Sequence, residues 1–155
     1  MLVFALINST AIEKANAMFD KFRLCVFSAV KGVVLDHGRP VTGAKVLRTY
    51  EWGWGGDREE RDEAVTDESG RFQMPAIFRT SVSGALIPHE PHISQLLTIV
   101  ANGKEYMAWS VMKRDYEENS EVDGKPTSII CRLENEVGRH GTIYGICEPD
   151  LTSNR

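Results

Sequence analysis

Two histidines near the middle of the chain are the residues best suited to binding a metal ion. The run His89-Glu90-Pro91-His92 offers two imidazoles and a carboxylate, which are ligand types that zinc accepts. The spacing differs from the helical H-E-x-x-H motif, and Pro88 and Pro91 exclude a regular helix. Because a further ligand is missing, we expect a polar loop that holds no metal or other cofactor.

Two tryptophans lie in a glycine-rich run, Trp52-Gly53-Trp54-Gly55-Gly56, that is followed by charged residues. An exposed tryptophan is costly unless it meets another surface, and glycine lets a second backbone approach closely. Tryptophan is also enriched among the residues that dominate binding at protein interfaces. We therefore expect a contact surface for another protein, made by Trp52, Trp54, Gly55, Asp57 and Arg58. The alternative is that one or both rings fold back over an open end of the domain.

The remaining patterns identify no catalytic centre. Serine, histidine and aspartate occur without the G-x-S-x-G turn of a nucleophile, and the glycine patterns of phosphate-binding loops are missing. The acids of one charged stretch lack the spacing of an EF-hand, so we expect them to form a solvated face: Glu117, Glu118, Glu121 and Asp123. The sequence thus predicts a protein that is not an enzyme.

Composition restricts the class of partner and the compartment. The chain has 155 residues and a formal net charge of −4, with Lys and Arg scattered among acids, which argues against a nucleic-acid surface. No stretch approaches the roughly 20 apolar residues of a membrane span. The three cysteines, Cys25, Cys131 and Cys147, are odd in number, which favours buried free thiols and a cytoplasmic location. A Cys25–Cys131 disulfide is the alternative.

The first 25 residues are expected to form a short amphipathic helix. Thr10 and Glu13 have the spacing of a capping box at a helix start. Four apolar residues then fall on one helical face: Ile12, Ala15, Phe19 and Phe22. Two alternatives stay open. Ala15-Asn16-Ala17 resembles a signal-peptide cleavage site, which would place the protein in the periplasm, and Met18 is a second candidate start.

From residue 26 onward the pattern is that of short strands separated by turns. We expect a domain over residues 26–134 and a tail over 135–155 with one short strand at 142–146. The Asn102-Gly103 turn between two alternating runs predicts a hairpin, and the turn at 67–70 predicts another. Residues 53–62 and 113–125 are expected to be solvated loops. About seven strands with such turns indicate a β-sandwich.

Two segments resemble a known group of domains. Residues 32–46, GVVLDHGRPVTGAKV, and 66–72, TDESGRF, are similar to the carboxypeptidase regulatory-like and transthyretin-like domains. In that resemblance the glycines make turns, Ala44 is small where two sheets approach, and Phe72 fills the core. The resemblance implies a mainly β chain with a single immunoglobulin-like (prealbumin-like) antiparallel sandwich. It is specific for fold and not for activity.

The enzymes of this group, the hydroxyisourate hydrolases, are a poor match. Val33 occupies the position of their catalytic histidine, and their C-terminal Tyr-Arg-Gly-Ser signature is missing. His37 lies in a turn and is expected to be an exposed turn residue. From Met18 onward the chain also resembles an uncharacterised family of small bacterial proteins. We therefore expect a bacterial protein-binding domain, with immunity to a secreted toxin as one role. The alternatives are a carbohydrate- or small-ligand-binding module and, with less support, a metal-dependent enzyme at His89 and His92.

Overall fold

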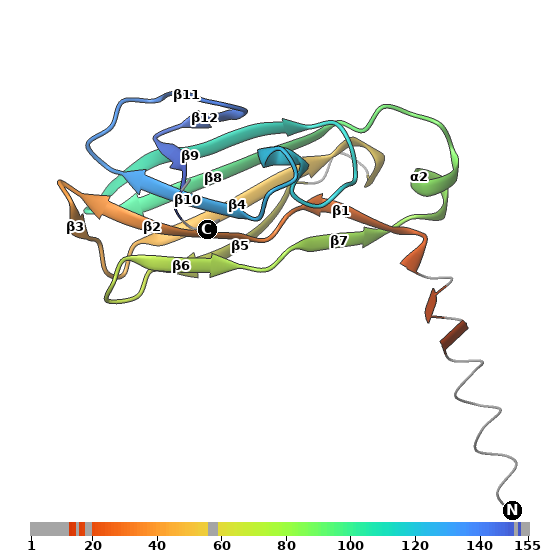
Figure 1. Ribbon diagram of the computed structural model, residues 1–155, viewed down its shortest axis with the longest axis horizontal. Helices are drawn as coiled ribbons and strands as arrows, with labels where there is room; N and C mark the ends of the chain where they lie inside the picture. The colour runs from red at the N-terminus through yellow and green to blue at the C-terminus, as the bar shows by residue number, and fades with distance from the viewer. Residues whose placement is uncertain (1–12, 15, 18–19, 56–58, 151, 153–155) are drawn as a thin grey trace, which may run out of the picture.

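The structure is a computed structural model that describes residues 13–14, 16–17, 20–55, 59–150 and 152, and it is mainly β (Figure 1). The described residues of the expected N-terminal helix, residues 13, 14, 16, 17 and 20, are helical and exposed. The capping residue Thr10 and the apolar positions Ile12, Ala15 and Phe19 lie outside the described residues. The strands fall into two larger sheets and one two-stranded ribbon.

The first larger sheet has five strands in the order β13-β10-β2-β3, with β6 also paired to β2. Strands β2 and β10 run parallel, although nearly a hundred residues separate them, and they lie side by side in Figure 1. The other pairs are antiparallel. The members are β2 (Val30–Asp36), β3 (Arg39–Pro40), β6 (Arg71–Met74), β10 (Thr127–Arg132) and β13 (Cys147–Pro149).

The second larger sheet has six strands in the order β11-β12-β9-β8-β4-β5, all antiparallel. Strands β8 and β9 form the expected hairpin, in which Asn102 and Gly103 both adopt positive φ, at 52° and 73°. The members are β4 (Lys45–Trp52), β5 (Glu59–Val65), β8 (Ile93–Ala101), β9 (Lys104–Lys113), β11 (Gly138–His140) and β12 (Ile143–Gly145).

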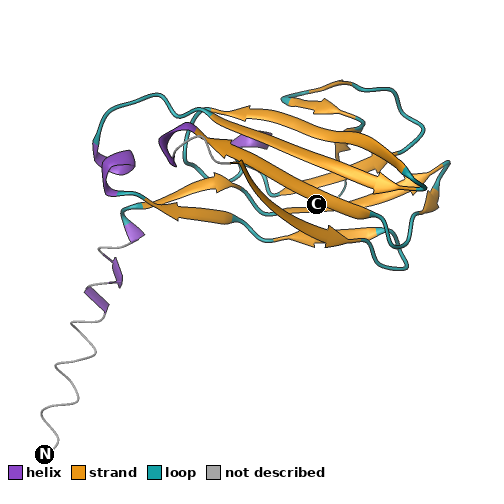
Figure 2. Ribbon diagram, turned by 180° about the vertical axis from the view of Figure 1, so that it is seen from behind, coloured by secondary structure: helices purple, strands orange, loops and turns teal. Residues whose placement is uncertain are grey.

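The two-stranded ribbon and three short helical segments complete the described part of the chain. Strands β1 (Arg23–Phe27) and β7 (Ile77–Thr80) continue the line of β2 and β6 towards one end of the molecule, where α2 (Val82–Leu86) follows (Figure 2). The other helical segments are the 3₁₀ turns η1 (Gly53–Gly55) and η2 (Ser120–Val122). The described residues thus contain thirteen strands, several of two to four residues, where the sequence predicted about seven.

Several expected boundaries differ from the structure. Strand β1 begins at Arg23, three residues before the expected domain start. Residues 135–155, expected to be a tail with one strand, contribute β11, β12 and β13 to the two larger sheets. Strand β5 begins at Glu59, so the end of the predicted loop over 53–62 is paired backbone. The run of five charged residues that begins β5 concealed this strand, because its apolar positions are few.

One buried cluster of apolar side chains joins the sheets. It includes Val34 and Ile129 from the five-stranded sheet and Val46, Leu97 and Trp109 from the six-stranded sheet. The alternation of buried and exposed residues along β4 and β8 follows the two-residue period of a strand. This is why the sequence pattern correctly located these two strands.

Gly32 has a packing role instead of the turn role expected for it. It lies in the middle of β2, and a Cβ atom there would lie 2.7 Å from the ring of Phe72 and 2.9 Å from the side chain of Ile129. Gly70 is a true turn residue, with φ of +71° and with Val34 O 2.5 Å from the position of a Cβ atom. Glycine is required at both sites, but for different reasons.

The turn over residues 67–70 connects the two sheets and is not a hairpin. Strand β5 pairs with β4, whereas β6 pairs with β2. Asp67 Oδ1 accepts hydrogen bonds from the backbone N–H groups of Ser69, at 2.8 Å, and Arg71, at 2.9 Å. The turn chemistry was predicted correctly, but local sequence does not determine which strand pairs with which.

Both expectations for the cysteines were wrong in part. The structure has a Cys131–Cys147 disulfide between β10 and β13, where these residues are directly paired. Cys25 is a buried free thiol, as expected. The sequence missed the bridge because the short strand β13 was not recognised.

Candidate functional site

The Trp52 ring is part of the core. Trp52 ends β4 on its inward-facing side and is only 8% exposed. Its indole Nε1 donates a hydrogen bond to the Tyr116 hydroxyl at 3.1 Å, and the two rings meet edge to face. The adjacent Trp54, in η1 with Gly55, is half-buried and donates from Nε1 to Ser83 Oγ at 3.1 Å. The predicted contact residues Asp57 and Arg58 lie outside the described residues.

His89 contacts both Trp54 and Tyr116, and Tyr116 is the hydrogen-bond partner of Trp52. Its ring stacks on Trp54 with centroids 4.1 Å apart. His89 Nδ1 lies 2.7 Å from the carbonyl oxygen of Ile87, which can only accept, so Nδ1 carries the proton. In the neutral ring Nε2 then accepts from the Tyr116 hydroxyl, 2.8 Å away. Burial raises the pKa of Tyr116, although the Trp52 hydrogen bond opposes this, and a protonated hydroxyl is what the arrangement requires.

This aromatic cluster lies at the end of the molecule near α2. A Cβ atom on Gly84 of α2 would lie 3.0 Å from the Trp54 ring, so the helix packs closely on the indole. The rings therefore fold back over an end of the domain, which is the alternative the sequence left open. Of the predicted contact residues, only Trp54 keeps a partly exposed indole among those whose side chains are described.

The expected metal candidates do not converge. Both nitrogens of His89 have partners within the protein, and His92 is exposed with Nδ1 2.9 Å from the carbonyl oxygen of Glu90. Within the described residues, the set of three residues able to hold an ion lies elsewhere, at Asp36, His37 and Glu134. The His37 side chain there is 80% exposed, as expected for a turn residue.

A buried ion pair is the main feature that the sequence did not reveal. The side chains of Lys113 and Glu121 are 1% and 0% exposed, with Nζ and Oε2 3.2 Å apart. Both were expected in a solvated loop, and that prediction was wrong. Glu121 also accepts from the Ser28 hydroxyl at 2.7 Å and from Gln95 Nε2 at 2.8 Å. Lys113 donates to Ser120 Oγ at 2.5 Å and to the carbonyl oxygen of Glu117.

The pKa of Glu121 reflects this surrounding. Burial by itself raises the pKa, but hydrogen bonds from Ser28 and Gln95 and the charge of Lys113 outweigh it, so the pKa is below its usual value. The carboxylate is therefore charged and fully engaged in the folded protein. Its oxygens hold the backbone N–H of Ser28 and the side chains of Ser28, Gln95 and Lys113.

The buried polar side chains satisfy backbone groups where the strand pairing is interrupted: at the bulge of β1, between β1 and β2, and between β6 and β7. Gln95 donates to Val26 O at 2.9 Å, and Glu121 accepts from Ser28 N at 3.1 Å. Arg48 donates from Nη1 to Pro75 O at 2.6 Å. Unpaired buried backbone groups are costly, so these contacts explain why polar residues occupy core positions.

Arg48 is held by a second contact. Its side chain is 1% exposed, and its Nε and Nη2 donate to the two oxygens of Asp62 at 2.8 and 2.5 Å. Asp62 belongs to β5, so this two-point contact ties the edge strand to the core. Position 48 lies between the buried residues Val46 and Tyr50, two residues from each. Because side chains two residues apart in a strand point the same way, the sequence indicated that Arg48 points inward.

The outer face of the six-stranded sheet carries exposed apolar side chains. We define this outer face as the side turned away from the core cluster, comprising Leu47, Thr49, Leu96, Thr98, Met107, Met112 and Tyr144. Strand register aligns Leu47 with Thr98 and Met107, and Thr49 with Leu96. The exposed fractions of Met107, Met112 and Tyr144 are 41%, 51% and 47%. A groove of about 570 Å³ lies on this face over β5, β4 and β8, and Leu47, Thr49, Leu96 and Thr98 line it.

Carboxylates border this face. Glu63 and Glu105 line the groove, and Glu51 lies beside Thr49 on β4. Within the described residues these three acids have no ion-pair partner, whereas the neighbouring Glu59 is paired with Arg61. The outer face is therefore apolar in the middle, and among the described residues its charged border has more acids than cations, the cations being Lys45, Arg61 and Arg139.

The fold and these sites define a mainly β domain with a buried polar network. Residues 30–136 match a protein family described as a domain of unknown function, DUF6795, and the chain belongs to this family. Among curated proteins, none matches the chain significantly. In the described part of the chain, no helix has the length and apolar character needed to cross a membrane.

Proposed function

We propose that this protein is a non-enzymatic, protein-binding domain with an immunoglobulin-like, prealbumin-like β-sandwich. Support for the sandwich comes from two sheets that share one core cluster, and from the resemblance of residues 32–46 and 66–72. The parallel β2–β10 pair departs from a purely antiparallel arrangement.

The outer face of the six-stranded sheet carries the functional proposal. A solvated sheet face normally presents polar side chains, yet Leu47, Leu96, Met107 and Met112 occupy this one. Exposed apolar patches with polar borders mark interaction surfaces. The partner is a protein with an apolar contact area bordered by Lys and Arg, which complement the unpaired acids Glu51, Glu63 and Glu105.

The carbohydrate-binding alternative has less support. Sugars bind by stacking on exposed aromatic faces, but Trp52 is buried and Trp54 is stacked on His89. The expected cytoplasmic location is likewise less favoured. The Cys131–Cys147 disulfide supports an oxidising compartment, which corresponds to the periplasmic alternative.

Site-specific photo-crosslinking in the native host tests the proposal. A photoreactive amino acid at Thr98, in the centre of the outer face, should trap one protein, and the same probe at the exposed turn residue Glu68 should not. Glu63→Lys with Glu105→Lys should abolish the adduct by repelling a basic border. The matched pair Glu68→Lys with Glu118→Lys changes net charge equally and should leave it intact.

The crosslinking results distinguish a partner on the outer face from non-specific contact. An adduct that forms from Thr98, disappears with the charge reversal on the outer face and survives the control reversal supports the proposal. Failure to trap a protein from Thr98, or equal trapping from Glu68, overturns it. An adduct that is insensitive to both charge reversals overturns the assigned basic border.

A further inference from the structure

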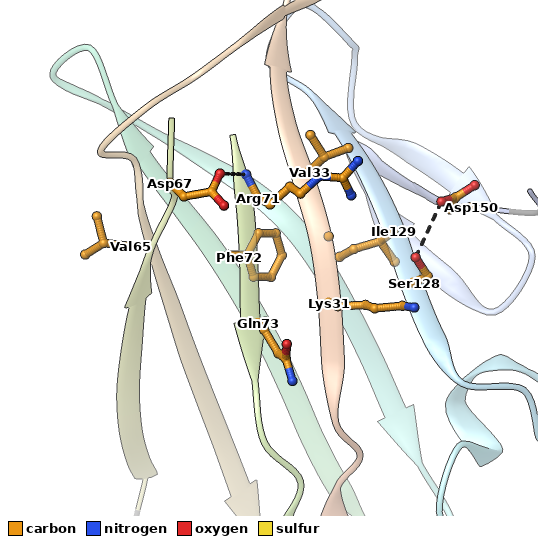
Figure 3. Close-up of a pocket in the computed structure, with 11 residues that line it drawn as sticks. Lys31, Val33, Val65, Asp67, Arg71, Phe72, Gln73, Ser128, Ile129 and Asp150 are labelled. Carbon is orange, nitrogen blue, oxygen red and sulfur yellow. Dashed lines mark hydrogen bonds between the residues drawn. The ribbon is translucent and has the colours of Figure 1, made fainter. Parts of the chain in front are cut away.

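A second groove lies on the outward side of the five-stranded sheet. It has a volume of about 440 Å³ and crosses β6, β2 and β10 (Figure 3). Gly32, Phe72 and Ile129 face the core in these strands. The residues between them therefore point outward, and those that line the groove are Lys31, Val33, Arg71, Gln73 and Ser128.

The groove contains two cations without partners. The Lys31 and Arg71 side chains form no hydrogen bond or ion pair with any described residue. By contrast, Arg48, Arg79 and Arg132 each pair with an acid. Figure 3 shows Arg71 extending over β2 beside Val33, and Lys31 extending towards β10.

The two acids of this groove are already occupied by donors within the protein. Asp67 Oδ1 accepts from two backbone N–H groups of its own turn. Asp150 accepts from the backbone N–H and hydroxyl of Thr152 at 3.0 and 2.6 Å, and from Ser128 Oγ at 3.5 Å. The groove therefore combines two cations that have unused donors with two carboxylates, of which Asp67 Oδ1 and Asp150 accept hydrogen bonds within the protein.

The positions of the two cations indicate the shape of the ligand. Arg71 is paired with Val33, and Lys31 with Gln73, so Lys31 and Arg71 are diagonal neighbours on adjacent strands. Such neighbours are about 7–8 Å apart. In an extended peptide, side chains two residues apart point the same way and are about 7 Å apart.

We propose that this groove binds an extended acidic peptide segment in which carboxylate side chains occur at every second residue. One carboxylate binds the Arg71 guanidinium through two hydrogen bonds, and the next binds the Lys31 ammonium. Val33, which is opposite Arg71 and two residues from Lys31 on β2, contacts the peptide stem. This site is on the opposite sheet from the outer face defined above and does not depend on the proposed function there.

Isothermal titration of the full chain at low ionic strength tests the assignment with three probes. These are a hexapeptide of alternating Glu and Ser, the matching peptide of alternating Gln and Ser, and inorganic phosphate. We expect the Glu peptide to bind, with an affinity that falls as salt is raised, and the Gln peptide to give no heat. The double substitution Lys31→Gln with Arg71→Gln should lower the affinity for the Glu peptide by about tenfold or more.

A matched variant controls for net charge. Lys104→Gln with Arg139→Gln also removes two exposed cations, at strands of the other sheet, and should leave the affinity unchanged. Amide chemical shifts should change at Lys31, Val33 and Ser128 in the native chain, and they check that each variant is folded. Equal binding of both peptides, equal weakening by both variants, or phosphate that displaces the peptide at matched concentration overturns the peptide assignment.

Discussion

Glu121 accepts a hydrogen bond from the backbone N–H of Ser28 at 3.1 Å, although the two residues are 93 positions apart in the chain. Ser28 lies where β1 ends and β2 has not begun, so its N–H has no partner in the sheet. The same Ser28 accepts through its hydroxyl from Asn119 N at 2.8 Å. The loop after β9 thus satisfies the backbone N–H that is left unpaired between β1 and β2. The same contacts hold the loop in place.

Glu121→Gln is expected to remove an acid-sensitive part of the stability. The folded-state pKa of Glu121 is lowered, so its contribution is present above the unfolded-state pKa and lost as pH falls through the folded-state value. The free energy of unfolding in urea should therefore fall less between pH 7 and pH 3 in Glu121→Gln than in the native chain. Equal pH dependence would contradict the assigned charge state. Glu118→Gln, at an exposed site in the same loop, is the control.

Removing Lys113 should be more damaging than removing an exposed lysine. Lys113→Ala leaves Glu121 charged and buried without its ion pair, a change that costs about 3–5 kcal/mol in other proteins. The measurement is the urea midpoint at pH 7, with Lys104→Ala at the start of the same strand as control. A loss below about 1 kcal/mol would mean that water reaches the pair.

The two tryptophans should behave differently. Trp52→Ala empties a core position and should destabilise the chain by about 3–5 kcal/mol. Trp54→Ala removes a half-exposed ring stacked on His89 and should cost clearly less. Thermal unfolding of both variants measures the difference. A similarly small loss of stability in both variants would instead indicate that Trp52 is a surface residue, as the sequence predicted.

Gly32→Ala tests the packing of Phe72 over β2. The added methyl group meets the Phe72 ring and Ile129 within 3 Å, so we expect a loss of about 1–3 kcal/mol from overpacking. Gly138→Ala is the matched control, since its nearest neighbour lies 3.7 Å from the new Cβ atom. If the two variants unfold at the same urea concentration, the ring does not rest on Gly32.

Mass spectrometry after alkylation tests the cysteine assignment. In denaturant without reductant only Cys25 should react, and all three cysteines should react after reduction. In the folded protein Cys25 should stay unmodified, because burial raises its pKa and keeps the thiol protonated. Alkylation of three cysteines without reductant would show that the Cys131–Cys147 bridge does not form.

Sequence reasoning recovered the local parts of this structure and failed at the long-range ones. The Asn102-Gly103 hairpin and the Asp67 turn depend on neighbouring residues and were predicted. The pairing of β2 with β10 and of β10 with β13 depends on contacts between distant segments, which no local pattern encodes.

The buried polar network around Glu121 was harder to predict than the fold. Glu121 occurs among exposed acids, and only its contacts with the distant residues Ser28 and Gln95 reveal that it is buried. Gln95 alternates in phase with Ile93 and Leu97, so the sequence pattern predicts that its side chain points inward. The sequence does not predict which of the inward-facing polar residues contact one another, because that depends on how β1, β8 and η2 pack together.

The parallel pairing of β2 with β10 also determines when the chain can finish folding during its synthesis. Strand β2 occupies the middle of the five-stranded sheet, but its partner extends to Arg132. Pairing over such a long separation is intrinsically slow, and the N-terminal half emerges from the ribosome with one side of β2 unpaired. The nascent chain therefore remains incompletely folded until most of it has been translated, an interval in which chaperones or a translocation channel can engage it.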